Sequence, residues 1–249
     1  MVNRLKKESI KMIIGLILIM IFGIIFNTQL IIAANPEGPT RINITSNQTK
    51  VSTNTQAINI SGMYIANINV TATIQNRKWK AFVGNVLGSF TLADASGSSI
   101  YDWSFSTSSG RVYATRNSTS INWGNINCSN RSVLDVENTA LSHSDPSDNI
   151  TATFNSSIGA SHASFYVGSR QIAANRCPTI NTYIGNSTQD VRFEETALFD
   201  GTSIVYATIL ENNIGGYDNG EYDFQMIVPE NGGAGFSGST AYYLYIEIG

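Results

Sequence analysis

Apolar and polar residues alternate along much of the chain, and this alternation predicts β-strands. The longest alternating run is 58–74, where the apolar residues fall on one parity: Ile58, Ile60, Tyr64, Ala66, Ile68, Val70, Ala72 and Ile74. A period of two is typical of a strand with one buried and one solvated face. The run is unusually long for a single strand, so we expect a bend or bulge near Gly62.

Shorter alternating or wholly apolar runs predict further strands, separated by clusters of Gly, Asn and Ser. They are residues 42–45, 101–105, 149–155, 203–210 and 241–248. The run 203–210 is apolar on both parities and therefore predicts a central strand. The only plausible short helix is 136–144. Many short strands with turns between them predict an all-β fold, an antiparallel β-sandwich of Greek-key or jelly-roll type.

The N-terminus has the order of a secretory signal. Four basic residues within residues 4–11 precede an uncharged apolar stretch, 12–26, and small residues follow at Ala33 and Ala34. The alternative is an uncleaved membrane anchor over residues 12–34. Both interpretations place the remainder outside the cell membrane. We therefore divide the chain into a signal or anchor (1–34), an N-terminal strand and polar tether (35–57), and a β-sandwich domain (58–249) that could be two packed sub-domains.

Cys128 and Cys177 are the only cysteines. In an exported chain a disulfide between them is the default expectation. A catalytic thiol is the weaker alternative. A zinc site would need more ligands, and the two histidines of the chain form no zinc spacing with the cysteines.

The charges are sparse and unevenly distributed. Residues 35–189 hold 10 basic and 7 acidic residues, whereas residues 190–249 hold 10 acidic residues against Arg192 alone. No basic patch exists for nucleic acid or an anionic membrane, so we expect neither partner apart from a membrane at residues 12–34. The opposite charges of the two parts favour either a solvated acidic face or head-to-tail attraction between copies.

Ten N-x-[ST] triplets are possible sites of N-glycosylation, about twice the number that the composition gives by chance. They begin at Asn43, Asn47, Asn59, Asn69, Asn117, Asn127, Asn130, Asn149, Asn155 and Asn186. Five of them lie on the solvent parity of predicted strands, which permits a glycan without proving one. Bound or attached glycans are therefore possible partners.

No catalytic motif stands out. The stretch 141–146 contains Ser142, His143 and Asp145, but neighbours in sequence rarely form a triad, and a nucleophile elbow is absent. Glu194 and Glu195 are adjacent, so on a strand they would face opposite ways and could not act as a carboxylate pair. These features favour a protein that is not an enzyme.

Two weaker binding candidates remain. Residues 215–224 bring Asp218, Asn219, Glu221 and Asp223 together in a pattern that Ca²⁺ could use, although a solvated turn is the favoured interpretation; no other cofactor is expected. Trp79 and Trp103 alternate correctly for core packing, whereas Trp123 is the tryptophan expected to be exposed and to bind a ligand such as a sugar.

Two segments, 79–103 ("WKAFVGNVLGSFTLADASGSSIYDW") and 222–249 ("YDFQMIVPENGG…AYYLYIEIG"), resemble an uncharacterised family of exported β-rich surface proteins found mostly in archaea. That resemblance implies an envelope or extracellular setting and no assigned activity. More loosely, an exported Ser/Thr/Asn-rich β domain is similar in architecture to archaeal thread-like pilus subunits, which assemble by donor-strand complementation.

We therefore expect a non-catalytic structural protein of the cell surface, a filament or envelope subunit that associates with itself or with other envelope proteins. The alternatives are an adhesin or carbohydrate-binding module, and an extracellular enzyme with an unrecognised site. For self-association, the short strand 41–45 either pairs within its own domain or adds to the sheet edge of a neighbouring copy.

Overall fold

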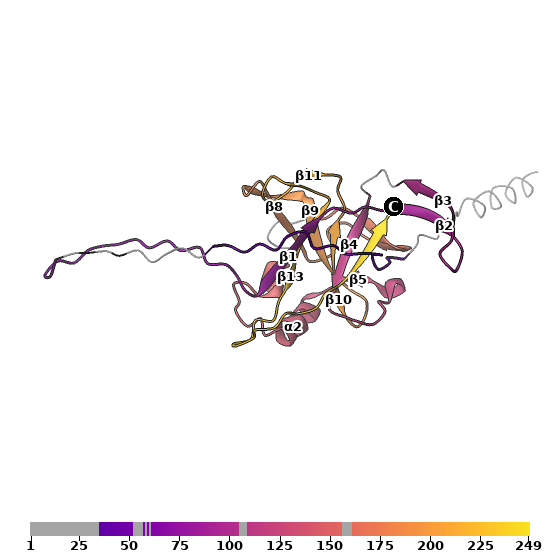
Figure 1. The fold of residues 1–249 in the computed structure, drawn as a ribbon. Helices are drawn as coiled ribbons and strands as arrows, with labels where there is room; N and C mark the ends of the chain where they lie inside the picture. The colour runs from indigo at the N-terminus through magenta and orange to yellow at the C-terminus, as the bar shows by residue number, and fades with distance from the viewer. Residues whose placement is uncertain (1–34, 52–56, 58, 60, 105–108, 156–160) are drawn as a thin grey trace, which may run out of the picture. The chain divides into compact units, whose positions relative to one another are not determined.

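The computed structural model describes residues 35–51, 57, 59, 61–104, 109–155 and 161–249 (Figure 1). The chain divides after Ala34, and the expected signal or anchor segment lies outside the described residues. Within the described part, no helix has the length and apolar character needed to cross a membrane.

The elements are mostly short strands. Their bounds are β1 Trp79–Gly84, β2 Ser89–Ala93, β3 Ser99–Ser104, β4 Gly110–Thr115, η1 Trp123–Asn125, β5 Asn127–Cys128, α2 Arg131–Ala140, α3 Ile150–Thr153, β6 Phe165–Val167, β7 Arg170–Ile172, β8 Thr179–Ile184, β9 Thr188–Phe199, β10 Ile204–Ile209, β11 Ile214–Gly215, β12 Glu221–Tyr222, β13 Phe224–Pro229 and β14 Tyr243–Ile248. The all-β class is confirmed, and the strand pairs are antiparallel.

The largest sheet has six strands. Its order is β14-β4-β10-β9-β5, and β8 also pairs with β9 (Figure 1). Because β10 pairs with residues 195–199 of β9, β5 and β8 must share the opposite edge of that long strand. Five of the six residues of β10 are buried and the sixth is partly buried, which confirms the prediction of a central strand over 203–210. The C-terminal strand is also confirmed, as the edge strand β14.

The first face of this sheet packs against α2, α3 and the two-stranded sheet of β1 and β13. The buried cluster consists of Val112, Ala114, Leu134, Leu141, Ile150, Phe154, Ala197, Ile204, Tyr206, Leu210, Met226 and Val228. Within each strand of the sheet, these residues are two positions apart, and residues directly opposite each other on neighbouring strands lie on the same face. Trp79 is partly buried against this cluster, as its place in an alternating strand predicted.

The second face packs against η1 and the β6–β7 hairpin. Its cluster consists of Tyr113, Ile121, Trp123, Ile126, Phe165, Val167, Ile172, Cys177, Leu198, Val205 and Ala207. The sheet is therefore covered on both faces, which explains why β4, β9 and β10 carry apolar residues on both parities.

Side chains of the large sheet satisfy backbone groups of β13, the strand that lies over its first face. The Oε2 atom of Glu195 accepts a hydrogen bond from Ile227 N at 2.8 Å. The hydroxyl of Thr208 lies 2.8 Å from the carbonyl oxygen of Gln225 and donates to it. A buried strand edge needs such partners, because unpaired backbone groups are costly away from water.

Two predicted strands are wrong. Residues 41–45 and the described part of 59–74 form no strand, and every described residue from 40 to 51 and from 61 to 77 is exposed. We call the described residues 40–77 the arm. Its two limbs run side by side, joined by bonds from Thr49 and Lys50 to Gln75 and from Lys50 to Thr73 (Figure 1). The alternation predicted a buried face, but nothing in the described chain covers it.

The predicted strand 149–155 is also wrong, because Ile150–Thr153 forms the helix α3. Asn149 caps this helix, with its side-chain oxygen accepting from Ala152 N at 2.7 Å. The apolar residues Ile150 and Phe154 are four apart, a spacing that suits either a strand or a helix. The expected helix over 136–144 overlaps α2, which begins earlier, after its cap Asn130.

We predict that Glu195 makes stability fall as pH rises. Burial raises the pKa of Glu195 well above its usual value, so the folded state keeps a proton that the unfolded state releases above about pH 4.5. Wild type should lose about 1.4 kcal/mol of unfolding free energy per pH unit relative to Glu195→Gln, until Glu195 ionises in the folded state. Urea unfolding of both proteins between pH 5 and 7 measures this, and parallel pH profiles would contradict it.

Candidate functional site

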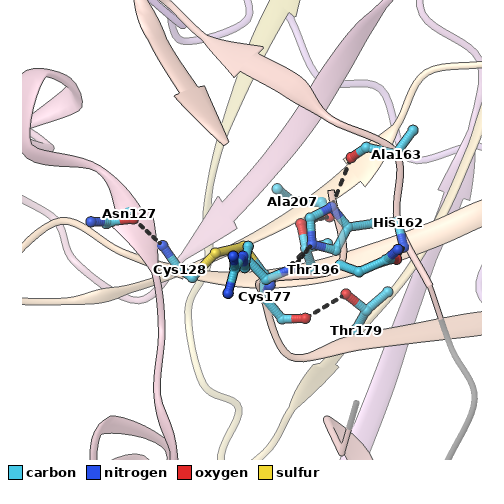
Figure 2. Close-up of a disulfide and its surroundings, with 10 residues drawn as sticks. Asn127, Cys128, His162, Ala163, Cys177, Thr179, Thr196 and Ala207 are labelled. Atoms are coloured by element: carbon cyan, nitrogen blue, oxygen red, sulfur yellow. Dashed lines mark hydrogen bonds between the residues drawn. A yellow bond between two sulfur atoms is a disulfide. The ribbon is translucent and has the colours of Figure 1, made fainter. Parts of the chain in front are cut away.

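Cys128 and Cys177 form a disulfide, as predicted (Figure 2). Their Cα atoms lie 4.7 Å apart, and the bridge joins β5 to the segment that leads into β8. Since both cysteines are bonded, neither offers a thiol for catalysis or metal binding. The bridge therefore has a structural role, fastening the covering layer of the second face to the sheet.

His162 lies next to this disulfide and orders the loop that carries Cys177 (Figure 2). Its Nε2 atom accepts hydrogen bonds from the backbone N–H groups of Arg176 and Cys177, both at 3.0 Å. The proton is therefore on Nδ1, which donates to Ala163 O at 2.8 Å. Both ring nitrogens are occupied, so His162 has no lone pair available for a substrate or a metal ion.

His143 also has a structural position. Its ring is buried, with Nε2 2.6 Å from the carbonyl oxygen of Glu230 and an edge-on contact with Trp79. The neighbouring carboxylate of Asp145 accepts from the backbone and hydroxyl of Ser147, and not from the histidine. The arrangement within 141–146 therefore lacks the hydrogen bonds of a catalytic triad.

The adjacent glutamates face opposite ways, as expected for a strand. Glu194 pairs with Arg111 at 3.0 Å on the second face of the sheet, and the Arg111 guanidinium lies 3.6 Å from the centre of the Phe165 ring. Glu195 lies on the first face, against Ile227. The two carboxylates therefore have different surroundings and form no acid–base pair.

The calcium candidate is not assembled. Asp223 is buried, and its carboxylate accepts from the backbone N–H groups of Val86 and Asn213. Asp218 instead accepts from Gly220 N and the Tyr222 hydroxyl, while Glu221 is exposed. Among the residues that the structure describes, no three His, Cys, Asp or Glu side chains are grouped to hold a metal ion. Asp218 and Asn219 lie in a hydrogen-bonded turn, where Asn219 has a positive φ of 68°, whereas Glu221 begins β12.

The expectations for two tryptophans are wrong. Trp123 is only 8% exposed, because η1 turns it between Tyr113 and Tyr245 in the second core. Trp103 is 50% exposed on the β2–β3 hairpin, where its ring contacts that of Tyr101. The short helix η1 buries Trp123. The β2–β3 hairpin is exposed on both sides and leaves Trp103 in contact with solvent.

The sequon asparagines have varied surroundings. Asn43, Asn47, Asn59 and Asn69 are exposed on the arm, whereas Asn149 and Asn155 are half-buried near α3. Asn127, Asn130 and Asn186 are exposed in the body of the protein, and Asn117 is half-buried at the end of β4. The strand-parity argument therefore fails for Asn149 and Asn155. Glycan occupancy stays a prediction for all ten.

The arm exposes many apolar side chains, as the β2–β3 hairpin also does. Nine of its large apolar side chains are exposed: Ile42, Ile44, Val51, Met63, Tyr64, Ile65, Ile68, Val70 and Ile74. Ile65 is 97% exposed and Ile44 is 82% exposed. Burying one such side chain is worth about 1.5–3 kcal/mol. Large exposed apolar patches are typical of interaction sites. No acidic residue lies between Glu37 and Asp94, whereas Arg41, Lys50 and Arg77 make the arm basic.

The free edge of the large sheet lies along β14. Glu37 makes the one bridge recorded there, with paired bonds of 3.0 and 2.8 Å to Ile246. Pro36 and Pro39 flank Glu37, and proline has no N–H group with which to extend the pairing. The bridge therefore ends after a single residue, and the strand expected at 41–45 does not continue it.

No protein-family model, curated protein or solved structure matches this chain. The site must therefore be interpreted from its own residues. The alternation of residues 58–74 predicted a strand with one buried face, whereas the described residues of that range form no strand and are exposed.

We predict that the disulfide supplies a large part of the stability. Closing a loop across the 49-residue separation of Cys128 and Cys177 gives about 4 kcal/mol in the chain-entropy model. The double variant Cys128→Ser/Cys177→Ser should lose about this much unfolding free energy in urea denaturation. Reductant should destabilise wild type and leave the double variant unchanged; equal stability of the oxidised wild type and the variant would contradict the prediction.

Proposed function

We propose that this protein is a non-catalytic structural subunit of an extracellular cell-surface assembly, a filament or an envelope layer. Copies associate through the arm, which binds the body of a neighbouring copy. The observation that carries the proposal is the exposure of the apolar side chains in the described residues of the arm, which no described segment of the chain covers.

The neighbouring copy offers a surface of opposite charge. Residues 190–249 hold 10 acidic residues against Arg192. Four of the ten, Glu194, Glu195, Asp200 and Asp223, are buried, so the negative surface charge comes from the other six, which are exposed or half-buried. The segment also includes β14 with its short Glu37 bridge. An arm without acidic residues is attracted to such a surface, and the attraction should weaken with salt. If the arm of each copy binds the next copy, the contact is head to tail. Such a contact gives a filament or layer when its rotation does not close a ring.

The non-catalytic part of the proposal rests on the hydrogen bonding of the candidate catalytic groups. His162 has both ring nitrogens occupied by backbone groups, and both cysteines are in a disulfide. Glu194 is neutralised by Arg111, and Glu195 serves the edge of β13. Each of these side chains is therefore held by a bond within the fold.

We predict that polar substitutions in the arm abolish assembly without affecting the fold. Ile42→Asn/Ile65→Asn replaces two exposed side chains that have no described packing partner, so the unfolding free energy should change by less than about 0.5 kcal/mol. Sedimentation velocity at low salt should show wild type in large species and the variant as a monomer.

Val136→Asn is the matched control, because Val136 is 70% exposed on α2 and outside the arm. This control should assemble like wild type. A wild-type protein that stays monomeric at high concentration and low salt would contradict the proposal. An arm variant that unfolds would contradict the premise that the arm lacks packing partners in its own chain.

A carbohydrate-binding adhesin is the second candidate, and the exposed aromatic pair Tyr101 and Trp103 favours it over the buried Trp123. The face of an exposed aromatic ring can stack on the apolar face of a sugar. Glycan-array binding that is lost in Trp103→Ala and kept in Trp123→Phe would support this candidate. An array without bound glycans for wild type would remove it.

A further inference from the structure

A groove of about 520 Å³ lies between α2 and the connection from β9 to β10. One side is formed by Val133, Val136 and Ala140 of the helix, and the other by Phe199, Thr202, Ser203 and Ile204. Arg116 and Glu137 also line the groove and form a two-bond ion pair with distances of 2.7 and 2.6 Å. The lining therefore combines apolar surface with groups that can bind hydroxyls, which suits a sugar.

Two of the ten sequon asparagines, Asn117 and Asn130, line this same groove. They come from different elements, since Asn117 follows β4 and Asn130 precedes α2. The neighbouring sequon residue Asn127 lies on β5, paired with β9, and is not part of the lining. The fold thus brings two possible attachment points to one hollow.

We propose that Asn130 is N-glycosylated and that the attached sugar lies in this groove, over Val133 and Val136. Asn130 is exposed, and its side-chain oxygen accepts from Val133 N at 3.1 Å as the N-cap of α2. This bond turns the amide group into a fixed orientation at the edge of the groove and leaves Nδ2 without a role in the cap.

The modification is compatible with the cap because it uses the other atom of the amide. Nδ2 attacks the anomeric carbon of an oligosaccharide activated on an isoprenoid phosphate. The carbon–oxygen bond to the phosphate breaks, the phosphate leaves with the electron pair, and Nδ2 loses one proton. The side-chain oxygen remains an acceptor, so the helix keeps its N-cap.

The groove also accounts for Val136, which is a 70% exposed apolar residue on a short amphipathic helix. A pyranose ring has an apolar face of C–H groups and a rim of hydroxyls. The apolar face can cover Val133 and Val136, and the hydroxyls can bond to Thr202, Ser203 or the outer side of the Arg116–Glu137 pair. The proposal does not depend on whether copies of the chain assemble.

The test uses Ser132→Ala in protein purified from the native host. This change destroys the Asn130 sequon but keeps Asn130 itself, so the N-cap and the unfolding free energy of the bare polypeptide are preserved. Mass spectrometry should find a glycan on the Asn130 peptide of wild type and none in the variant. Asn127→Gln is the matched control, since it removes a sequon three residues away and should leave the Asn130 glycan in place.

Hydrogen–deuterium exchange then tests the placement in the groove. The amides of α2 and of residues 199–204 should exchange at least a few-fold more slowly in wild type than in Ser132→Ala, and the Asn127→Gln protein should match wild type. An unmodified Asn130 in native protein would overturn the proposal. A glycan at Asn130 whose loss leaves the exchange of both segments unchanged would overturn it as well, because the sugar would then point into solvent.

Discussion

The structure depends on covering both faces of one six-stranded antiparallel sheet with thin layers of chain. Neither layer is a broad sheet of its own. The first face is covered by β1, β13 and two short helices, and the second by η1 and the β6–β7 hairpin. Such narrow layers leave unpaired backbone N–H and C=O groups near the core, and these groups need hydrogen-bond partners. The buried carboxyl of Glu195 and the hydroxyl of Thr208 do this for β13, and the Cys128–Cys177 disulfide fastens the covering layer of the second face.

The same requirement explains why the apolar side chains of the arm stay exposed. The inner strands β4 and β10 of the large sheet are buried between its two layers. Residues 40–77 do not reach it, because Pro36 and Pro39 end the contact with β14 after the Glu37 bridge. The arm then carries its apolar side chains into solvent, together with a basic charge that the C-terminal part of the chain can complement.

The sequence predicted those elements whose pattern had only one physical meaning. The residues of 203–210 are apolar on both parities, which requires two covered faces, and they form the buried central strand β10. The two cysteines could pair only with each other. In contrast, the spacing of Ile150 and Phe154 is compatible with both a strand and a helix. The side chain of Asn149 caps the segment and so favours the helix. The arm alternates like a strand, yet alternation alone cannot say whether another segment will cover its apolar face.

The surroundings of the candidate site residues were predicted less well than the fold, because they depend on contacts between segments far apart in the sequence. Trp123 has no local signal of burial, and of the two rings that enclose it, that of Tyr245 comes from β14 at the far end of the chain. Asp223 resembles a metal ligand in sequence, but the backbone of Val86, which bonds its carboxylate, lies far away along the chain. Asn117 and Asn130 line one groove because the fold brings the end of β4 next to the start of α2. The spacing of the sequons in the sequence does not predict this.

The central claim is that the arm of one copy contacts the body of another, and photo-crosslinking from the arm tests it most directly. A photoreactive amino acid replaces Ile65 in unlabelled protein, which is mixed with ¹⁵N-labelled wild type at low salt. If the arm binds a neighbouring copy, crosslinked peptides should join the unlabelled arm to labelled residues of 190–249. Crosslinks confined to single copies, or none between copies at high concentration, would contradict it.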